Sequence, residues 1–189
     1  MTHITASVDT TIPNPQNSNG FWVQIKSSSQ KMIIRLTKPV IQSNWASEIL
    51  FAIPRIFCGV VLAKDFGADK FGMPWSPSDK NLALFEVVDW FPQDVAEFGG
   101  LFALTPVFFA WMGAASEAIG GIFLALGLQT RIFSFLLICT MLVAIFCQQF
   151  QHGMWNMLAP MGFLWVAMYG LVNGSGRIGL DYLIGKKMS

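Results

Sequence analysis

The sequence has few of the side chains that hold metals and haems. It contains two histidines, His3 and His152, and three cysteines, Cys58, Cys139 and Cys147. A single histidine outside the first residues cannot supply both axial ligands of a haem within one subunit, and no zinc-ligand spacing is present. The cysteines form no C-x-x-C pair, which argues against a membrane dithiol oxidase. We expect no metal site.

Charge is also scarce, and nucleotide-binding loops are missing. Charged residues make up 12% of the chain, and the formal net charge of +1 gives no electrostatic reason to expect a nucleic-acid partner. No G-x-G-x-x-G pattern, Walker pattern or nucleophile elbow appears. We therefore expect no intrinsic cofactor, and any electron transfer would need a partner protein or a soluble cofactor.

Long apolar runs, in contrast, are abundant. Hydrophobic residues make up 53% of the chain, and about 20 apolar residues suffice to cross a bilayer as a helix. An all-α, integral membrane four-helix bundle in contact with lipid is the predicted fold. A soluble helical protein with an unusually apolar core is a weaker alternative, and a β-barrel is weaker still because the runs do not alternate. The predicted spans are Ile49–Phe66, Leu104–Leu126, Ile132–Phe150 and Trp155–Val172.

The distribution of charge predicts the topology. Residues 67–103 hold two lysines against six acids, whereas basic residues dominate before the first span and after the fourth. Because positively charged loops stay in the cytoplasm, we predict cytoplasmic N- and C-termini and a long outer loop between the first two helices. The protein is then a multi-pass protein of the bacterial inner membrane.

Three regions are predicted along the chain. Residues 1–20 are polar and rich in Thr, Asn, Ser and Pro, as in a disordered tail. Residues 21–47 form a basic juxtamembrane segment, either lying on the inner membrane surface or acting as an ordinary linker. Residues 48–187 form the four-helix transmembrane domain.

Prolines predict three local features. An amphipathic helix is expected on the outer face within residues 79–100, ending at Pro92. Pro54 is expected to loosen the first helix near its start, and Pro160 to break the fourth.

The three cysteines all fall inside predicted spans. Cys58 and Cys139 lie at similar predicted depth, so a disulfide between them is geometrically conceivable. Buried, unreactive thiols are the favoured interpretation.

Glu117 stands in the middle of the second apolar run. Three and four residues away on either side lie Gly113, Ala114, Gly120 and Gly121, which share its helix face. Small residues allow another helix to approach closely, so Glu117 is predicted to face the bundle interior. From its depth we predict an ion pair with Arg55 in the first span. Alternatively, Arg55 extends to the inner headgroups and Glu117 stays protonated.

A second polar group is predicted near the outer end of the third span. Gln148 and His152 are four residues apart and share a face of a regular helix. The topology places Lys64, Asp65 and Lys70 at the same end. A solvated or helix-capping role is the alternative for His152. The candidate catalytic residues are thus Glu117, Arg55 and His152, and the candidate cofactor-binding residues are Glu117, Gln148, His152 and Lys70.

Several of these patterns resemble those of the DoxX family of four-helix membrane proteins. The resemblance covers about residues 50–187, with two departures. Asn156 stands where the family often has a glutamate, and about 45 N-terminal residues and the long acidic loop are additions to the family pattern. The similar motifs are Arg55, Gly67-x-x-Lys70, Glu117-x-x-Gly120-Gly121, Gly127-x-x-Thr130-Arg131 and Gly174-x-Gly176-Arg177-x-x-Leu180-Asp181.

The resemblance implies a redox setting without fixing the chemistry. Some members are membrane subunits of thiosulfate:quinone oxidoreductases, and others associate with thiol or oxidative-stress enzymes. A membrane subunit of a redox-linked complex that contacts quinone is therefore the first functional hypothesis. A non-catalytic structural or assembly subunit of a larger membrane complex is the second, and a small-solute transporter is the third. Whether the chain is itself an enzyme stays open.

Overall fold

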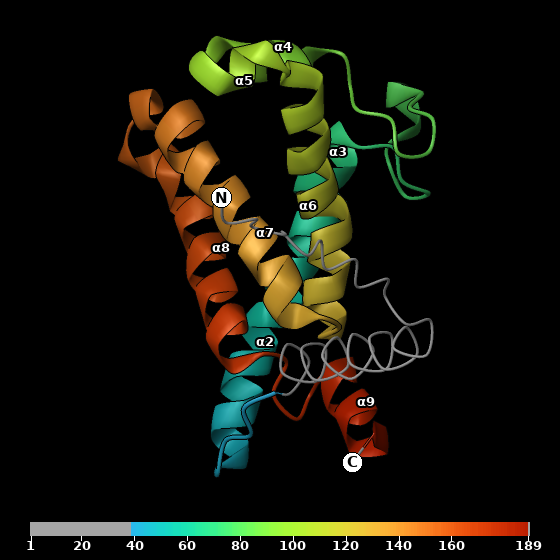
Figure 1. The fold of residues 1–189 in the computed structure, drawn as a ribbon, viewed down its shortest axis with the longest axis vertical. Helices are drawn as coiled ribbons and strands as arrows, with labels where there is room; N and C mark the ends of the chain where they lie inside the picture. Colours follow the sequence, from blue (N-terminus) through green and yellow to red (C-terminus); the bar gives the residue numbers. More distant parts are fainter. Residues whose placement is uncertain (1–38, 189) are drawn as a thin grey trace, which may run out of the picture. The chain divides into compact units, whose positions relative to one another are not determined.

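Four helices that are long and apolar enough to cross a membrane dominate the structure, a computed structural model that describes residues 39–188 (Figure 1). Within these residues the only β-pairing is an isolated bridge between Phe71 and Val87. The predicted all-α, four-helix membrane bundle is confirmed. The predicted tail 1–20 and most of segment 21–47 lie outside the described residues. The four spans are Trp45–Lys70, Pro106–Leu126, Thr130–His152 and Met154–Asn173.

The first span changes its helical geometry near one end. It consists of α2 (Trp45–Val61), the π-helix η1 (Leu62–Gly67) and the short turn α3 (Ala68–Lys70). α2 begins where the side chain of Asn44 accepts a hydrogen bond from the backbone N–H of Ala46 at 3.0 Å. It continues through Pro54. A π-helix has more residues per turn than an α-helix, so η1 rotates the residues that follow it, including Lys70.

The second span, α6 (Pro106–Leu126), packs antiparallel to the first through glycines. A Cβ atom at Gly59 would lie 2.6 Å from the carbonyl oxygen of Gly121, and one at Gly121 would lie 2.7 Å from that of Gly59. Farther along, a Cβ atom at Gly67 would overlap the backbone of Ala118. Only glycine allows backbones to come this close. These contacts fix the register of the two helices.

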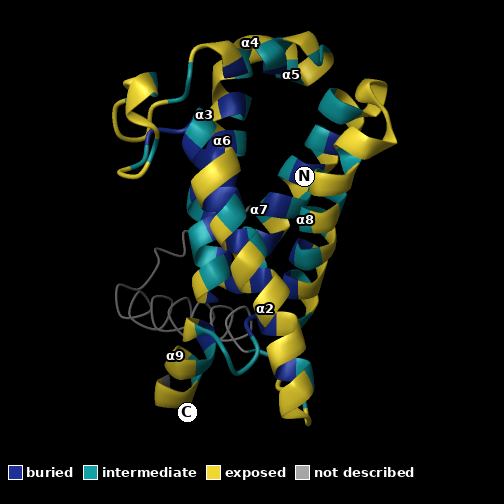
Figure 2. Cartoon of the chain, turned by 180° about the vertical axis from the view of Figure 1, so that it is seen from behind, coloured by how far each residue is buried: buried dark blue, intermediate teal, exposed yellow. Residues whose placement is uncertain are grey.

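The third and fourth spans form the other side of the bundle. α7 (Thr130–Val143) continues as the π-helix η3 (Ala144–Gln149) and the 3₁₀ turn η4 (Phe150–His152), and α8 (Met154–Asn173) returns beside them. Buried faces turn toward the interior and exposed faces outward (Figure 2). The predicted break at Pro160 is wrong, because α8 runs through it; a proline in a membrane helix is tolerated where neighbouring groups satisfy the freed carbonyl. A core to which all four spans contribute contains Leu62, Leu124, Leu137, Met141 and Ala167.

Short helices lie across one end of the bundle, which we call the α4 end (Figure 1). The predicted loop helix exists, but Pro92 lies in its first turn and does not end it. The first turn tolerates proline because its N–H groups have no helical acceptor. An ion pair of 3.0 Å joins Lys80 to Asp69, and this hydrogen bond raises the pKa of Lys80. The short helices are η2 (Ser78–Lys80), α4 (Trp90–Glu97) and α5 (Gly100–Leu104).

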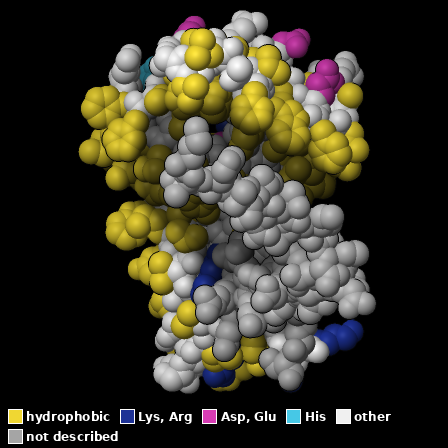
Figure 3. All heavy atoms as spheres, viewed as in Figure 1, with side chains coloured by type: hydrophobic (Ala, Val, Ile, Leu, Met, Phe, Trp, Pro, Cys, Tyr) yellow, Lys and Arg dark blue, Asp and Glu magenta, His cyan; other side chains and the backbone are white. Residues whose placement is uncertain are grey.

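The opposite end, the α9 end, carries both the start and the close of the described chain. α9 (Leu180–Met188) follows a glycine-rich turn, and the backbone N–H of Val40 donates to the carbonyl oxygen of Asn173 at 2.8 Å. Both ends on one side agree with an even number of spans; that this side is cytoplasmic stays a prediction. On the face drawn in Figure 3, acidic side chains appear at the α4 end, and lysines and arginines toward the α9 end.

Candidate functional site

Glu117 points into the bundle from the middle of α6. Only 4% of the residue is exposed, and its Oε2 atom accepts a hydrogen bond from Nζ of Lys70 at 2.8 Å. The predicted inward orientation of Glu117 is therefore correct. The predicted ion pair with Arg55 is wrong, because Lys70 occupies that place.

Lys70 reaches Glu117 through local features of the first span. The π-helix η1 rotates the helix just before Lys70, and Gly67 brings the backbone against Ala118, the neighbour of Glu117. The Nζ atom of Lys70 also lies 5.1 Å from the ring centroid of Phe91 on α4, at the distance of a cation–π contact. Lysine and glutamate thus neutralise each other inside the bundle. The spacing Gly67-x-x-Lys70 is present in the sequence. The direction of Lys70 could not be predicted from it, because regular α-helical geometry does not include the rotation caused by η1.

Arg55 lies closer to the α9 end and closes a helix terminus. Its guanidinium donates hydrogen bonds to the carbonyl oxygens of Leu124 and Ala125 at the C-terminal end of α6, and to that of Ile178. The last carbonyls of a helix lack partners within it, and the helix dipole favours a cation there. Leu124 is about two turns beyond Glu117, or ~10 Å along the axis. The depth estimate failed because it assumed that the start of α2 is level with the end of α6; α2 instead extends beyond that end, so that Arg55 lies beside Leu124 and Ala125.

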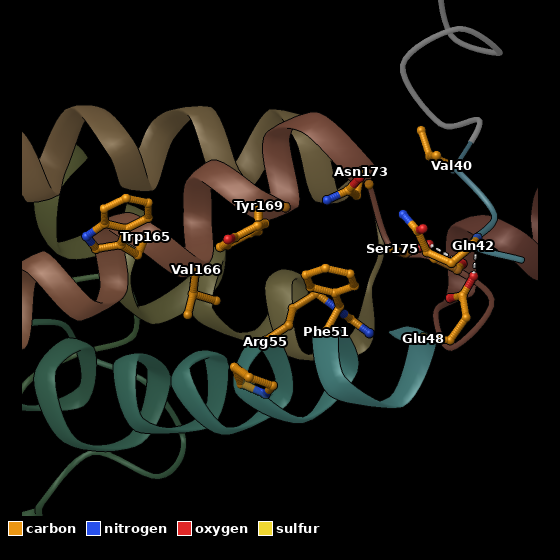
Figure 4. A pocket seen from close by; sticks show the side chains of 14 residues that line it. Val40, Gln42, Glu48, Phe51, Arg55, Trp165, Val166, Tyr169, Asn173 and Ser175 are labelled. Atoms are coloured by element: carbon orange, nitrogen blue, oxygen red, sulfur yellow. Dashed lines mark hydrogen bonds between the residues drawn. The ribbon is translucent and has the colours of Figure 1, made fainter. Parts of the chain in front are cut away.

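A cavity of about 220 Å³ adjoins Arg55 between α2 and α8 (Figure 4). Glu48, at its edge, is 3% exposed and accepts hydrogen bonds from the backbone N–H groups of Gln42 at 2.7 Å and Arg177 at 2.8 Å. The charged groups beside this cavity are thus bound to the backbone of the chain itself. Its side walls are mainly apolar and aromatic: Phe51, Trp165, Val166 and Tyr169.

Asp181 is a second buried acid to which sequence reasoning assigned no separate role. It is 1% exposed, and its carboxylate accepts hydrogen bonds from the backbone N–H of Gln129 at 2.7 Å and from the backbone N–H and Oγ1 of Thr130, each at 3.0 Å. Asp181 therefore caps the N-terminus of α7 from a distant segment. Its own N–H donates to Gly127 at 2.9 Å. The closing glycine–arginine–aspartate motif thus fastens the chain after α8 to the turn between α6 and α7.

The Lys70–Glu117 pair borders a cavity of about 240 Å³ between α4, α6 and the third span, which we call the Glu117 cavity. Next to it, the hydroxyls of Ser116 and Thr140 are 2.6 Å apart and join α6 to α7. Apolar walls with a few polar groups are typical of a small-molecule site. The polar lining is Lys70, Glu117, Thr140 and Gln148, and most of the apolar lining is Phe91, Val95, Phe98, Phe102, Phe109, Met112 and Val143.

Gln148 and His152 do not act as one group. Gln148 lines the Glu117 cavity, whereas His152 lines a separate, polar cavity of about 570 Å³ at the α4 end. The rule that residues four apart share a face holds only for an α-helix, and here η3 and η4 replace it. Lys64 and Asp65 are exposed and line none of these cavities. Of the candidate cofactor-binding residues, the structure brings together Glu117, Lys70 and Gln148 and leaves His152 outside.

The cysteines are not uniformly buried. None of the three forms a disulfide; Cys58 is half-buried, and Cys139 and Cys147 are exposed. The favoured expectation of buried thiols therefore fails for Cys139 and Cys147. Cys139 lines the Glu117 cavity and Cys147 the polar cavity beside it. Within residues 39–188, no three His, Cys, Asp or Glu side chains lie close enough to hold a metal ion.

Comparison with models of known protein families shows the family of this chain. The family model named DoxX matches residues 50–150, more than half of the chain. The chain belongs to the DoxX family. No curated protein and no solved structure matches it. The matched part of this DoxX protein contains all four polar residues of the Glu117 cavity, whereas α8 and the Asp181 cap lie beyond it.

Proposed function

We propose that this DoxX protein is a membrane subunit of a redox-linked complex of the bacterial inner membrane, and that a quinone ring binds in the Glu117 cavity. The observation that carries the proposal is a buried lysine–glutamate pair, 2.8 Å long, at the edge of an aromatic-lined cavity within a membrane-spanning bundle. A quinone needs a flat apolar cleft with a proton donor or acceptor near its carbonyl oxygens. The Glu117 cavity offers an apolar, aromatic lining together with Lys70 and Glu117.

The polar lining suits the two oxidation states of such a ring. The ammonium of Lys70 and the side-chain amide of Gln148 can donate hydrogen bonds to quinone carbonyl oxygens. When a quinol is oxidised, its two electrons leave for a partner protein and its two hydroxyl protons are released. The carboxylate of Glu117 is placed to accept them one at a time, and it must pass on the first proton before it takes the second. Reduction runs the same proton transfer in reverse. The described chain supplies the site and the proton acceptor, and the complex supplies the redox group.

The size of the cavity argues for a ring and against a whole lipid. Its volume of about 240 Å³ lies just below the ~300–1,000 Å³ of sites that enclose a drug-sized ligand. A substituted ring would fill it and leave an isoprenoid tail outside. Exposed apolar side chains such as Phe108 and Phe146 on α6 and the third span provide a surface for that tail.

The first test measures quinone binding in purified protein. We expect quinone to be extracted from protein purified gently from its native membrane, and a short-chain benzoquinone to bind to the protein in nanodiscs. Lys70→Gln removes the charged donor and should weaken binding about tenfold or more. Glu117→Gln keeps the shape but cannot accept a proton, so quinone-linked activity of the native complex should fall about 100-fold.

Asp79→Asn, in the exposed loop, is the matched control and should change neither quantity. If no quinone is extracted and Glu117→Gln leaves quinone-linked activity untouched, the proposal is wrong.

A second candidate function, that of a structural or assembly subunit, is favoured by α8. Only 11% of this span is buried within the described chain, against 28–50% for the other three. Its exposed side chains include two tryptophans, Trp155 and Trp165. A span with so little packing of its own suits contact with another membrane subunit as well as with lipid.

A further inference from the structure

The polar cavity at the α4 end directly adjoins the Glu117 cavity. We call this polar cavity the vestibule. Phe98 and Gln148 line both cavities and are the residues that the two linings share. On the far side of these two residues, the lining changes from mainly apolar to mainly polar. The vestibule is lined by Asp94, Glu97, Phe98, Cys147, Gln148, Gln149, Gln151, His152 and Asn156.

We propose that the vestibule is a water-filled entrance to the Glu117 cavity, that Phe98 and Gln148 form its gate, and that protons pass between Glu117 and the solution at the α4 end by this route. The proposal deepens the proposed function and rests on it for the role of the protons. Access of water to the cavity can be measured without any quinone.

The side chains that line the vestibule are suited to carrying protons. Protons move through water along chains of groups that both donate and accept hydrogen bonds. The vestibule offers such groups at its wall, from the carboxylates of Asp94 and Glu97 to the imidazole of His152. At the gate, Gln148 can donate through its nitrogen and accept through its oxygen. The titratable groups along the route are therefore Asp94, Glu97, Cys147 and His152 in the vestibule, and Lys70, Glu117 and Cys139 in the cavity.

Two other directions out of the Glu117 cavity are closed. The face of α6 next to Glu117 lies against the first span, where Gly67 is in backbone contact with Ala118. Toward the α9 end, Leu124 and Leu137 are both fully buried in the apolar core. A charged group inside a bilayer needs a wet path or a permanent partner. The vestibule is a polar cavity that adjoins this one.

The backbone on both sides of the gate departs from regular α-helix. Phe98 ends α4, and Gly99 and Gly100 follow it with φ of +72° and +53°. No heavy atom lies within 4 Å of a Cβ position at either glycine, so the gate segment has space to move. On the other side, Gln148 belongs to the π-helix η3. Both π-helices of the described chain thus lie in spans that present a polar side chain, Lys70 or Gln148, to this cavity.

The native cysteines provide the test. Cys147 lines the vestibule, Cys139 lines the Glu117 cavity, and Cys58 lines neither. Three variants that each retain one cysteine, made by Cys→Ser replacement of the other two, are placed in nanodiscs, where both membrane faces are accessible. A cationic methanethiosulfonate reagent is added, which reacts with the thiolate and hence with thiols in contact with water.

We expect Cys147 to react fastest, Cys139 more slowly, and Cys58 least. In the variant that retains Cys139, Phe98→Ala opens the gate and should speed labelling about tenfold, whereas Phe98→Trp should slow it. In the variant that retains Cys147, the same replacements should change labelling by less than about twofold. The melting temperature of each variant in detergent checks that the bundle is folded.

Two outcomes overturn the proposal. If Cys139 stays unreactive both with the native Phe98 and after Phe98→Ala, while the variant that retains Cys147 reacts, water does not enter the cavity. If Cys139 labels at the same rate with the native Phe98, after Phe98→Ala and after Phe98→Trp, water enters elsewhere. Since no quinone is present, a failure to bind quinone contradicts the proposed function and leaves the water route standing.

Discussion

Three acids are buried among the described residues, and each has a different type of partner. Glu117 has the ammonium of Lys70, Glu48 has backbone N–H groups together with Arg177, and Asp181 has the N-terminus of α7. An ionised carboxylate inside apolar surroundings is costly unless it is paired or hydrogen-bonded. Glu48 and Asp181 are held by the backbone and therefore stabilise the fold, whereas the pair at Glu117 borders a cavity and is available for chemistry.

At the residue scale, the Asp181 cap is expected to contribute measurably to stability. Asp181→Ala removes three hydrogen bonds at the start of α7 and should lower the free energy of unfolding by about 1–3 kcal/mol. Unfolding by sodium dodecyl sulfate in mixed micelles gives this quantity. Asp181→Asn keeps one acceptor oxygen and should lower the free energy of unfolding by less. Asp79→Ala, which replaces an exposed acid, should leave the free energy of unfolding unchanged. An Asp181→Ala variant as stable as the wild type would show that the cap is unimportant.

At the scale of elements, the contact between α2 and α6 decides which residues meet. Gly59 and Gly121 set the backbones against each other, and this register brings Lys70 level with Glu117 and Arg55 level with the end of α6. The two π-helices then rotate the ends of the first and third spans. The site is thus a product of helix register and local rotation and not of any single motif.

Replacing Gly121 by alanine is expected to separate these helices. The new Cβ would lie 2.7 Å from the carbonyl oxygen of Gly59, a backbone atom that can move only with its helix, and overpacking of this kind costs about 1–3 kcal/mol. The melting temperature should fall, and quinone binding should weaken because Lys70 moves with the first span.

Gly162→Ala on α8 is the matched control. No atom lies within 4 Å of the Cβ position there, so the same exchange should be neutral or raise the free energy of unfolding by up to about 1 kcal/mol through helix propensity. Equal effects at Gly121 and Gly162 would contradict the close packing of α2 on α6.

At the scale of the whole molecule, the two ends of the bundle differ in structure. The α9 end is closed by Arg55, Glu48 and Asp181, which bind backbone groups of distant segments. The α4 end holds the Glu117 cavity and the vestibule, under short helices joined by glycines. The α9 end is therefore held in place, while the α4 end can adapt. This arrangement is expected where a ligand reaches its site from one end of the bundle.

The exposed face of α8 leads to a prediction about assembly. A photo-crosslinking amino acid at Trp165, which is 60% exposed, should form a crosslink to another protein in native membranes if α8 binds a partner subunit. The same amino acid at Phe57 on α2, which is 67% exposed, is the control for random contact. Crosslinks from Trp165 alone would support an assembly role, and crosslinks to lipid alone from both positions would contradict it.

Much of the fold was predictable because it depends on local properties. The length of the apolar runs predicts four spans, and the small residues around Glu117 predict its inward orientation; both are confirmed. The partner of Glu117 was not predictable, because a depth estimate assumes regular helices that start at the first apolar residue. In the structure, α2 extends beyond the end of α6, so that Arg55 lies level with Leu124 and Ala125, and the π-helix η1 rotates Lys70 toward Glu117. For the same reason, the pairing of Gln148 with His152 failed at η3.

The sequence by itself determined the membrane class, the four helices and the inward-facing acid, since hydrophobic length and the 3.6-residue period act over a few turns of one helix. Tertiary structure alone decided that Lys70 and not Arg55 neutralises Glu117, that Arg55 closes the end of α6, and that Gln148 and His152 line different cavities. These outcomes depend on how far two backbones can approach and in which register they settle. The approach distance and the register are properties of a pair of helices, so they cannot be derived from the sequence of one helix alone.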